Sequence, residues 1–245
     1  MYTNPYQLKF ALLFVMIVAG LTAGAQVHLS AHDQSIHYDW ITPSHTLYKH
    51  TAFDTLGNIT GELVIDHATA IDTAHKEIAF INTVPFAPGK LLIDSSIDNY
   101  QGSARYTLTT FPATKHEFIK YLPATVEAHN IIKGVSSTKI TPMTEGYFDD
   151  NSVWDILGFI TFKKGIRYQL DCYGTDTHTQ VSIPFEIEYI FDEVTQEQGG
   201  SAVSNMVLRV TNPGATAYVW INKKTHLTTK EFVQGKGYSF SQVAI

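Results

Sequence analysis

Histidine is the side chain in this sequence most able to bind a metal, because the chain has 11 His and a single Cys. Five histidines fall early: His28, His32, His37, His45 and His50. The first two are four residues apart, which would place both on one face of a helix. A zinc site needs further ligands, and the sequence has no His-Glu-x-x-His motif and no Cys cluster. We therefore predict no metal site and interpret the early histidines as surface residues.

The common motifs of nucleophilic and phosphoryl-transfer catalysis are also missing from the sequence. It contains no Gly-x-Ser-x-Gly elbow and no glycine-rich phosphate loop. The one cysteine, Cys172, lies in an alternating run in which it shares a face with Tyr168 and Leu170, so we expect a core thiol. Glu186 and Glu188 are two residues apart, a spacing typical of the solvent face of a strand. We predict no catalytic residue, no cofactor and no enzymatic activity.

Composition limits the class of protein that these side chains belong to. Hydrophobic residues make up 44% of the 245 residues and charged residues 16%, which excludes a disordered chain. The 13 Tyr, 14 Phe and 3 Trp favour strands. A net charge of −6 argues against a protein that binds phosphate backbones, and Lys223-Lys224 is too short for a nucleic-acid patch. We predict no nucleic-acid partner.

The first 25 residues have the pattern of a secretory signal peptide. Lys9 precedes an apolar run over residues 10–19, which is too short to span a bilayer, and a small-residue site, Ala23-Gly24-Ala25, follows it. We predict cleavage after Ala25, with residues 26–245 forming one β-rich domain that has no transmembrane segment. The predicted location is the periplasm or the extracellular space; an uncleaved membrane anchor is the alternative.

Short alternating runs separated by turn residues predict an antiparallel sheet or barrel. Residues 26–54 are interpreted as a pairing arm and a first strand, and residues 53–65 as a hairpin around Gly57-Asn58. Pro85 and Pro88 are expected to turn the chain. The further predicted strands cover residues 78–84, 90–94, 100–110, 117–121, 125–133 (with a helix as the alternative), 139–148 (with an extended link broken by Pro142 as the alternative), 166–173, 180–192, 205–210, 217–222, 226–234 and 238–243.

One short helix is expected over residues 152–160. Polar residues 149–152 offer N-cap side chains. The residues that follow place apolar groups on one face: Val153, Trp154, Ile156, Leu157 and Ile160. We predict that this helix lies on the sheet as a plug. The pattern leaves open whether it is a lid that a ligand can displace or a permanent part of the core.

The end of the chain resembles a known superfamily. Residues 217–243 read AYVWINKKTHLTTKEFVQGKGYSFSQV: a strand ending in Trp-Ile, an Asn-Lys-Lys-Thr turn and a closing hairpin. With the preceding helix, this is similar to uncharacterised secreted proteins and to the periplasmic lipoprotein carriers of the LolA and LolB type. The overlap covers residues 146–243. The resemblance implies a mainly β fold, an incomplete antiparallel β-barrel (half-barrel) around a short helical plug, with an apolar cavity for an acyl chain.

The expected function follows from this cavity. Its candidate ligand-binding residues are Trp154, Leu157 and Phe159 on the plug and Tyr168, Leu170, Tyr189 and Trp220 on the sheet. The alternative is that these side chains simply fill the core. We predict an exported, non-enzymatic binding module for a hydrophobic, acyl-type ligand or lipoprotein. The alternative function is a structural or assembly protein of the cell envelope that docks a partner protein on its sheet edges.

Overall fold

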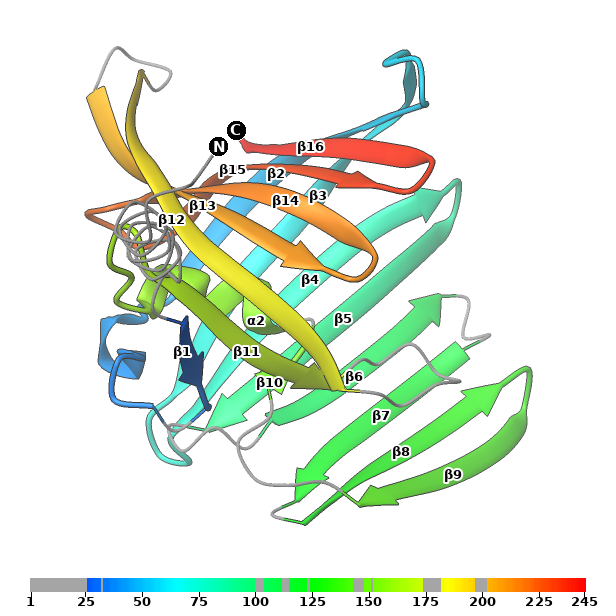
Figure 1. Ribbon diagram of the computed structural model, residues 1–245. Helices are drawn as coiled ribbons and strands as arrows, with labels where there is room; N and C mark the ends of the chain where they lie inside the picture. The colour runs from blue at the N-terminus through cyan, green and yellow to red at the C-terminus, as the bar shows by residue number, and fades with distance from the viewer. Residues whose placement is uncertain are drawn as a thin grey trace, which may run out of the picture.

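The computed structural model describes residues 26–31, 33–99, 104–111, 115–122, 124–142, 148–150, 152–173, 182–196 and 202–245 (Figure 1). The predicted signal peptide lies outside the described residues. The strands are β1 Gln26–Leu29, β2 Ser44–Phe53, β3 Ile59–Asp72, β4 Glu77–Ala87, β5 Lys90–Asn99, β6 Ala104–Phe111, β7 Lys115–Leu122, β8 Thr125–Ile132, β9 Val135–Pro142, β10 Phe148–Asp149, β11 Arg167–Tyr173, β12 Ser182–Gln196, β13 Ala202–Asn212, β14 Ala215–Asn222, β15 Thr228–Gly235 and β16 Tyr238–Ala244. The helical elements are η1 Tyr38–Trp40, α2 Ser152–Ile156 and η2 Leu157–Phe159.

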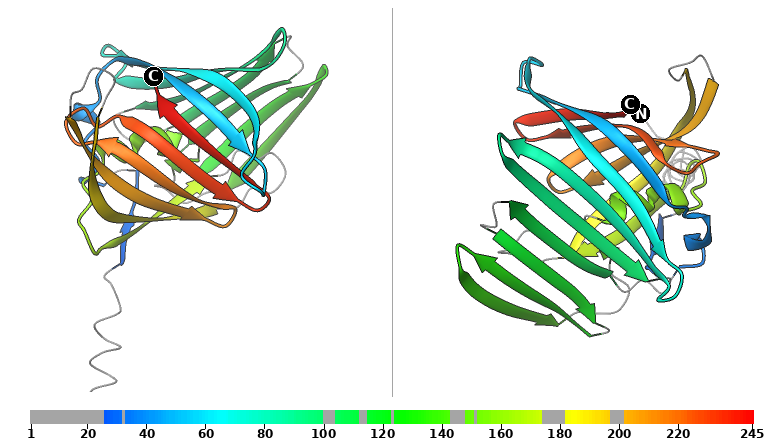
Figure 2. Two further views of the ribbon diagram at one scale, coloured as in Figure 1. Left: turned by 90° about the horizontal axis from the view of Figure 1, so that it is seen from above. Right: turned by 180° about the vertical axis from the view of Figure 1, so that it is seen from behind.

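All the strands belong to one curled sheet that does not close. Its order is β1-β11-β12-β13-β14-β15-β16-β2-β3-β4-β5-β6-β7-β8-β9, so the C-terminal strand β16 pairs with β2 near the start of the chain. Neighbours along this path are antiparallel except β1 and β11. Two short parallel strands, β1 and β10, cover consecutive parts of the β11 edge. Figures 1 and 2 show the sheet curling around α2, which confirms the predicted half-barrel with a short helical plug.

The hairpin expected around Gly57 is present, with β2 and β3 joined by residues 54–58. Asp54 anchors this turn: its carboxylate accepts hydrogen bonds from the backbone N–H groups of Leu56 and Asn58 at 2.8 and 2.9 Å. Gly57 has a φ of +84°, a conformation that costs a glycine little. A polar turn followed by an alternating strand therefore identified this part of the fold correctly.

The expectation that Pro85 turns the chain is wrong. Pro85 lies inside β4, paired with Leu91, and the turn falls at residues 88–89. A regular ladder needs a backbone N–H donor at each paired position, and proline has none. The register of β4 and β5 shifts immediately after Pro85, and this bulge lets the strands pair without that donor. The expected strand over residues 139–148 is also divided differently, because β9 begins at Val135 and forms a hairpin with β8.

The plug is α2 followed by η2, over the residues where the sequence predicts a helix. Asp149 caps it by accepting a hydrogen bond from the backbone N–H of Ser152 at 3.1 Å. The N-terminal segment secures its other end, since the N–H of His37 donates to the carbonyl of Phe159 at 2.8 Å. In the described part of the chain, no helix has the length and apolar character needed to cross a membrane.

Two groups of buried side chains stabilise the fold. The larger surrounds the plug, where Val153, Ile156 and Leu157 are fully buried against the inner faces of β11–β14. The smaller links the β7–β8 hairpin to the end of β11, with Tyr121 packed edge-on against Tyr173 at 5.6 Å. Burial of this apolar area is the main force that holds the helix on the sheet.

Candidate functional site

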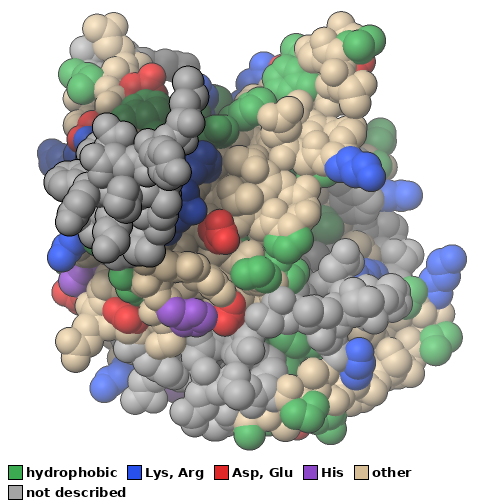
Figure 3. Space-filling view, in the orientation of Figure 1, with side chains coloured by type: hydrophobic (Ala, Val, Ile, Leu, Met, Phe, Trp, Pro, Cys, Tyr) green, Lys and Arg blue, Asp and Glu red, His purple; other side chains and the backbone are tan. Residues whose placement is uncertain are grey.

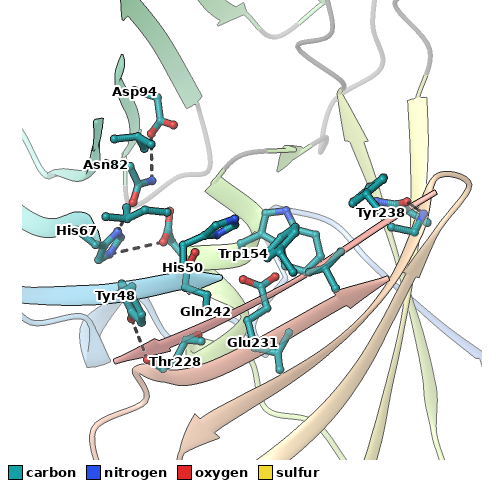
Figure 4. Close-up of a pocket in the computed structure, with 18 residues that line it drawn as sticks. Tyr48, His50, His67, Asn82, Asp94, Trp154, Thr228, Glu231, Tyr238 and Gln242 are labelled. Atoms are coloured by element: carbon teal, nitrogen blue, oxygen red, sulfur yellow. Dashed lines mark hydrogen bonds and ion pairs between the residues drawn. The ribbon is translucent and has the colours of Figure 1, made fainter. Parts of the chain in front are cut away.

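A cavity of about 430 Å³ lies between the plug and the inner face of the sheet (Figure 4). A volume of this size is in the range of small-molecule sites. Its walls come from β2–β5 on one side, β14–β16 on the other and α2 across the gap. The lining residues are Tyr48, His50, Ile65, His67, Asn82, Val84, Asp94, Trp154, Asp155, Asn212, Ala215, Val219, Thr228, Glu231, Val233, Tyr238, Phe240 and Gln242.

A chain of polar contacts runs along one wall of the cavity. His67 Nδ1 donates to Asn82 Oδ1 at 2.8 Å, and Asn82 Nδ2 donates to Asp94 Oδ1 at 3.0 Å. On its other side, His67 Nε2 faces Asp155 Oδ1 of the plug at 3.6 Å. These four residues come from β3, β4, β5 and α2, so the chain ties the plug to three neighbouring strands.

Glu231 projects into the cavity from the opposite wall (Figure 4). Strand alternation explains its direction, because Glu231 pairs with Val219 and shares the inner face with Val233, while Lys230 pairs with Trp220 on the outer face. Tyr48 lies nearby, and its hydroxyl donates to the carbonyl of Thr228 at 2.8 Å. A carboxyl group is thus placed among apolar inward-facing side chains.

The cavity favours the neutral forms of its titratable groups. Burial, followed by the charge of Asp155, raises the pKa of Glu231 to about 7. Burial and the nearby Asp94 raise the pKa of Asp155 well above its ordinary value, and burial also raises the pKa of Asp94. Burial lowers the pKa of His67 and that of His50. These shifts follow from desolvation, which disfavours whichever form is charged.

Aromatic rings form much of the remaining surface. Trp154 packs edge-on against Phe185 with ring centroids 5.5 Å apart, and Phe240 packs against His50 at 4.7 Å. Tyr238 is 48% exposed and lies where the cavity reaches solvent. Its ring fills the space beside Gly235, where an added Cβ would stand 2.2 Å from Tyr238 Cε1. The cavity therefore combines apolar rings with a few carboxyl and imidazole groups.

Of the seven residues predicted to bind ligand, Trp154 alone lines this cavity. Leu157, Phe159, Tyr168 and Leu170 are buried in the core around the plug.

The other two predicted residues also have different surroundings. Tyr189 packs partly against the same core and lies 5.2 Å from the ammonium group of Lys164. Trp220 faces the outer side, with the Lys230 ammonium group 4.3 Å from its ring and its indole N–H donating to Glu193. Trp220 and Phe232 are both partly buried.

Sequence reasoning missed the carboxyl groups of this cavity. Asp155 and Glu231 belong to a helix and a strand that are far apart in the chain, and no motif links them. A signal was present in each element: Asp155 interrupts the apolar run of the plug, and Glu231 occupies an inward position two residues before Val233. An acidic residue on an otherwise apolar face is the pattern that would have identified them.

The early histidines have separate partners. His28 faces Asp171 at 3.3 Å and His45 faces Asp66 at 2.7 Å, while His37 stacks on Trp40. His32 lies outside the described residues. Among the residues that the structure describes, no group of three His, Cys, Asp or Glu side chains has a metal-binding arrangement.

Cys172 is fully buried, and burial raises the pKa of its thiol. It is therefore the core thiol that the sequence predicts.

Comparison with known proteins supports the fold. No protein-family model matches the chain, and no curated protein matches it. The chain is similar to a solved structure described as a beta-barrel-like protein of a domain of unknown function, DUF1849, from Brucella abortus. The TM-score is 0.58 at 11% sequence identity, and the match covers 86% of this chain and 97% of that one. At this identity the likeness extends to the fold alone.

Proposed function

We propose that this is an exported, non-enzymatic binding protein that takes a hydrophobic ligand into the cavity beside the plug. The observation that carries the proposal is the cavity of about 430 Å³ inside an open sheet, whose wall combines aromatic and aliphatic side chains with polar ones. Concave, mostly apolar sites with a few polar groups are the usual form of small-molecule sites. The resemblance of the closing hairpin to periplasmic lipoprotein carriers points to the same use of the fold.

The ligand binds without displacing the plug in this proposal. Val153, Ile156 and Leu157 are each 0% exposed, so lifting the helix would uncover large apolar side chains. Each such side chain costs about 1.5–3 kcal/mol when it is transferred to water. Trp154 and Asp155 already face the cavity, and ligand contact with the plug therefore needs no opening of the core.

Native mass spectrometry of the purified protein tests the binding proposal. We expect a co-purifying small molecule that survives gentle ionisation and is lost on denaturation. Ala215→Trp should prevent its retention, because Ala215 lines the cavity opposite Gly235. Thr216→Trp is the matched control, since the neighbouring side chain points to the outer face of β14. Equal retention by the two variants would contradict the cavity as the binding site.

Export forms the second part of the proposal. The apolar run over residues 10–19 and the Ala23-Gly24-Ala25 site support it. The intact mass of the protein from the exported fraction should correspond to a chain that starts at Gln26. A chain in that fraction that still starts at Met1 would contradict cleavage.

A specific observation also favours the alternative role in envelope assembly. β9 is the edge strand of the sheet, and hydrophobic side chains lie on the surface over β8 and β9 (Figure 3). Val135 and Ile140 are 71% and 61% exposed. Exposed edges of this kind accept strands from partner proteins. A stable envelope partner recovered with the wild-type protein, and lost with Val135→Lys/Ile140→Lys, would favour assembly over ligand binding.

A further inference from the structure

The cavity contains acidic side chains that the protein does not neutralise. Asp94, Asp155 and Glu231 all line it, and its described lining includes no Lys or Arg. The basic groups among the described lining residues are His50 and His67, and burial lowers the pKa of each. The described wall therefore surrounds three carboxyl groups with apolar rings and contains no permanent positive charge.

Glu231 is the least satisfied of these carboxyl groups. Asp94 accepts a hydrogen bond from Asn82, and Asp155 faces His67. Glu231 points into the cavity, and no described residue donates a hydrogen bond to its carboxyl group (Figure 4). Groups left in this state are costly unless a ligand completes their hydrogen bonds.

We infer that the ligand is an organic cation, with a protonated amine placed near Glu231 and Asp155 and an apolar body against Trp154 and Phe240. This inference rests on the proposed binding function and adds the chemical class of the ligand. An ammonium group has three N–H donors and a positive charge, and the carboxyl groups that line the cavity can accept those hydrogen bonds and balance that charge. The indole face of Trp154 adds a cation-binding surface next to the same carboxyl groups.

Binding of a cation is coupled to loss of a proton from the cavity. Glu231 has a pKa of about 7, so near neutral pH the empty site is a mixture of the neutral and ionised forms. The groups that face it are Tyr48 and His50 from β2, His67 from β3, Asp94 from β5 and Asp155 from the plug. A charged amine favours the ionised form of Glu231, and its affinity should therefore increase as the pH rises from 6 to 8.

Octylamine, 1-octanol and octanoate have carbon chains of the same length and different head groups. Comparing their affinities therefore separates the effect of the head-group charge from that of the chain. Isothermal titration calorimetry at pH 8 measures each against the wild-type protein, with octylamine still charged because alkylamines titrate near the pKa of lysine. We expect octylamine to bind at least about tenfold more tightly than 1-octanol, and octanoate to bind most weakly, since a charge-assisted hydrogen bond contributes about 1.5–3 kcal/mol. The advantage of octylamine should shrink at pH 6.

Glu231→Gln tests the assignment of the charged group. It keeps the size of the side chain and should reduce octylamine affinity to that of 1-octanol. Glu186→Gln makes the same chemical change on an exposed side chain of β12 and should retain the tenfold preference. If Glu231→Gln does not fold, Asp155→Asn provides the same test from the plug.

The outcomes test the cation inference separately from the proposed binding of a hydrophobic ligand. Similar binding of all three ligands would overturn the cation inference and leave the hydrophobic-ligand proposal in place. Preferential binding of octanoate would also overturn it and favour an acyl ligand. Failure of all three ligands to bind would overturn both. A tenfold amine preference that disappears in Glu231→Gln and persists in Glu186→Gln supports the inference.

Discussion

Gly158→Ala should destabilise the protein strongly, because Gly158 is the point where the plug contacts the turn between β14 and β15. An alanine Cβ at this position would stand 1.7 Å from the carbonyl oxygen of His226, 2.8 Å from its carbonyl carbon and 3.2 Å from Ile221 Cγ2. The nearest of these atoms belongs to the backbone and cannot rotate away. The plug or the segment between β14 and β15 must therefore move by more than an ångström.

Several contacts would be strained together by that movement. The carbonyl of Gly158 is 3.1 Å from His226 Nδ1, and the ring of His226 stacks on Trp40 at 4.5 Å. The adjacent Phe159 carbonyl accepts the hydrogen bond from His37. Overpacking a core typically costs 1–3 kcal/mol, and a backbone clash lies at or above the top of that range. We expect a loss of about 3 kcal/mol or more, equivalent to roughly 6–12 °C in melting temperature for a protein of this size.

Urea denaturation followed by circular dichroism measures this loss. Gly61→Ala is the matched control, since Gly61 lies in β3 with nothing within 4 Å of an added Cβ. The control should change the free energy of unfolding by less than about 0.5 kcal/mol. If Gly158→Ala unfolds at the same urea concentration as Gly61→Ala, the tight packing of the plug against the turn between β14 and β15 is refuted.

Three further predictions concern groups whose surroundings differ. The free energy of unfolding should fall as pH rises from about 4.5 to about 7, because the pKa of Glu231 is near 4.5 in the unfolded chain and about 7 in the folded one. The Glu231→Gln variant should lack about 3 kcal/mol of that decline. Urea titration of both proteins at each pH measures the difference. Tyr121→Phe should cost about 1–3 kcal/mol in thermal unfolding, since the phenol donates to the buried carboxylate of Asp149. Trp220→Ala should cost about 1–2 kcal/mol, less than a fully buried tryptophan, because its ring lies on the outer face beneath Lys230; a loss above about 3 kcal/mol would contradict that position.

Local patterns in the sequence predict most of the fold. Alternating residues bounded by glycine and polar turns identify the hairpins, as at Gly57, and the polar residues before Ser152 identify the start of the plug. The strand ends are less predictable because pairing extends them: β12 runs from Ser182 to Gln196, beyond its expected end at residue 192. The place of Pro85 inside β4 is not predictable from its own strand, since a bulge in the ladder is a property of two paired strands.

The candidate site depends on long-range geometry, which explains why sequence reasoning identified so little of it. Aromatic and aliphatic residues of the plug were expected to face a ligand, yet Leu157 and Phe159 are core. Which side of α2 faces a cavity is decided by strands that lie elsewhere in the chain. Glu231 and Asp155 line the same cavity because β16 pairs with β2 and the sheet curls around the plug. Spacing in the sequence carries no information about that long-range pairing.

The distribution of charge provides the strongest physical reason to regard the cavity as functional. Several exposed carboxylates of this protein have cationic partners: Glu62 pairs with Lys49 at 2.7 Å, and Asp192 pairs with Lys164 at 3.0 Å. Such surface pairs stabilise a fold only slightly. Among the described residues that line the cavity, the carboxyl groups have no lysine or arginine beside them, and an apolar residue of similar size would be more stable there. Costly groups of this kind concentrate at binding and catalytic sites. The cost at Glu231 is removed when a cation occupies the cavity, and the ligand that the site favours is therefore one that carries the missing positive charge.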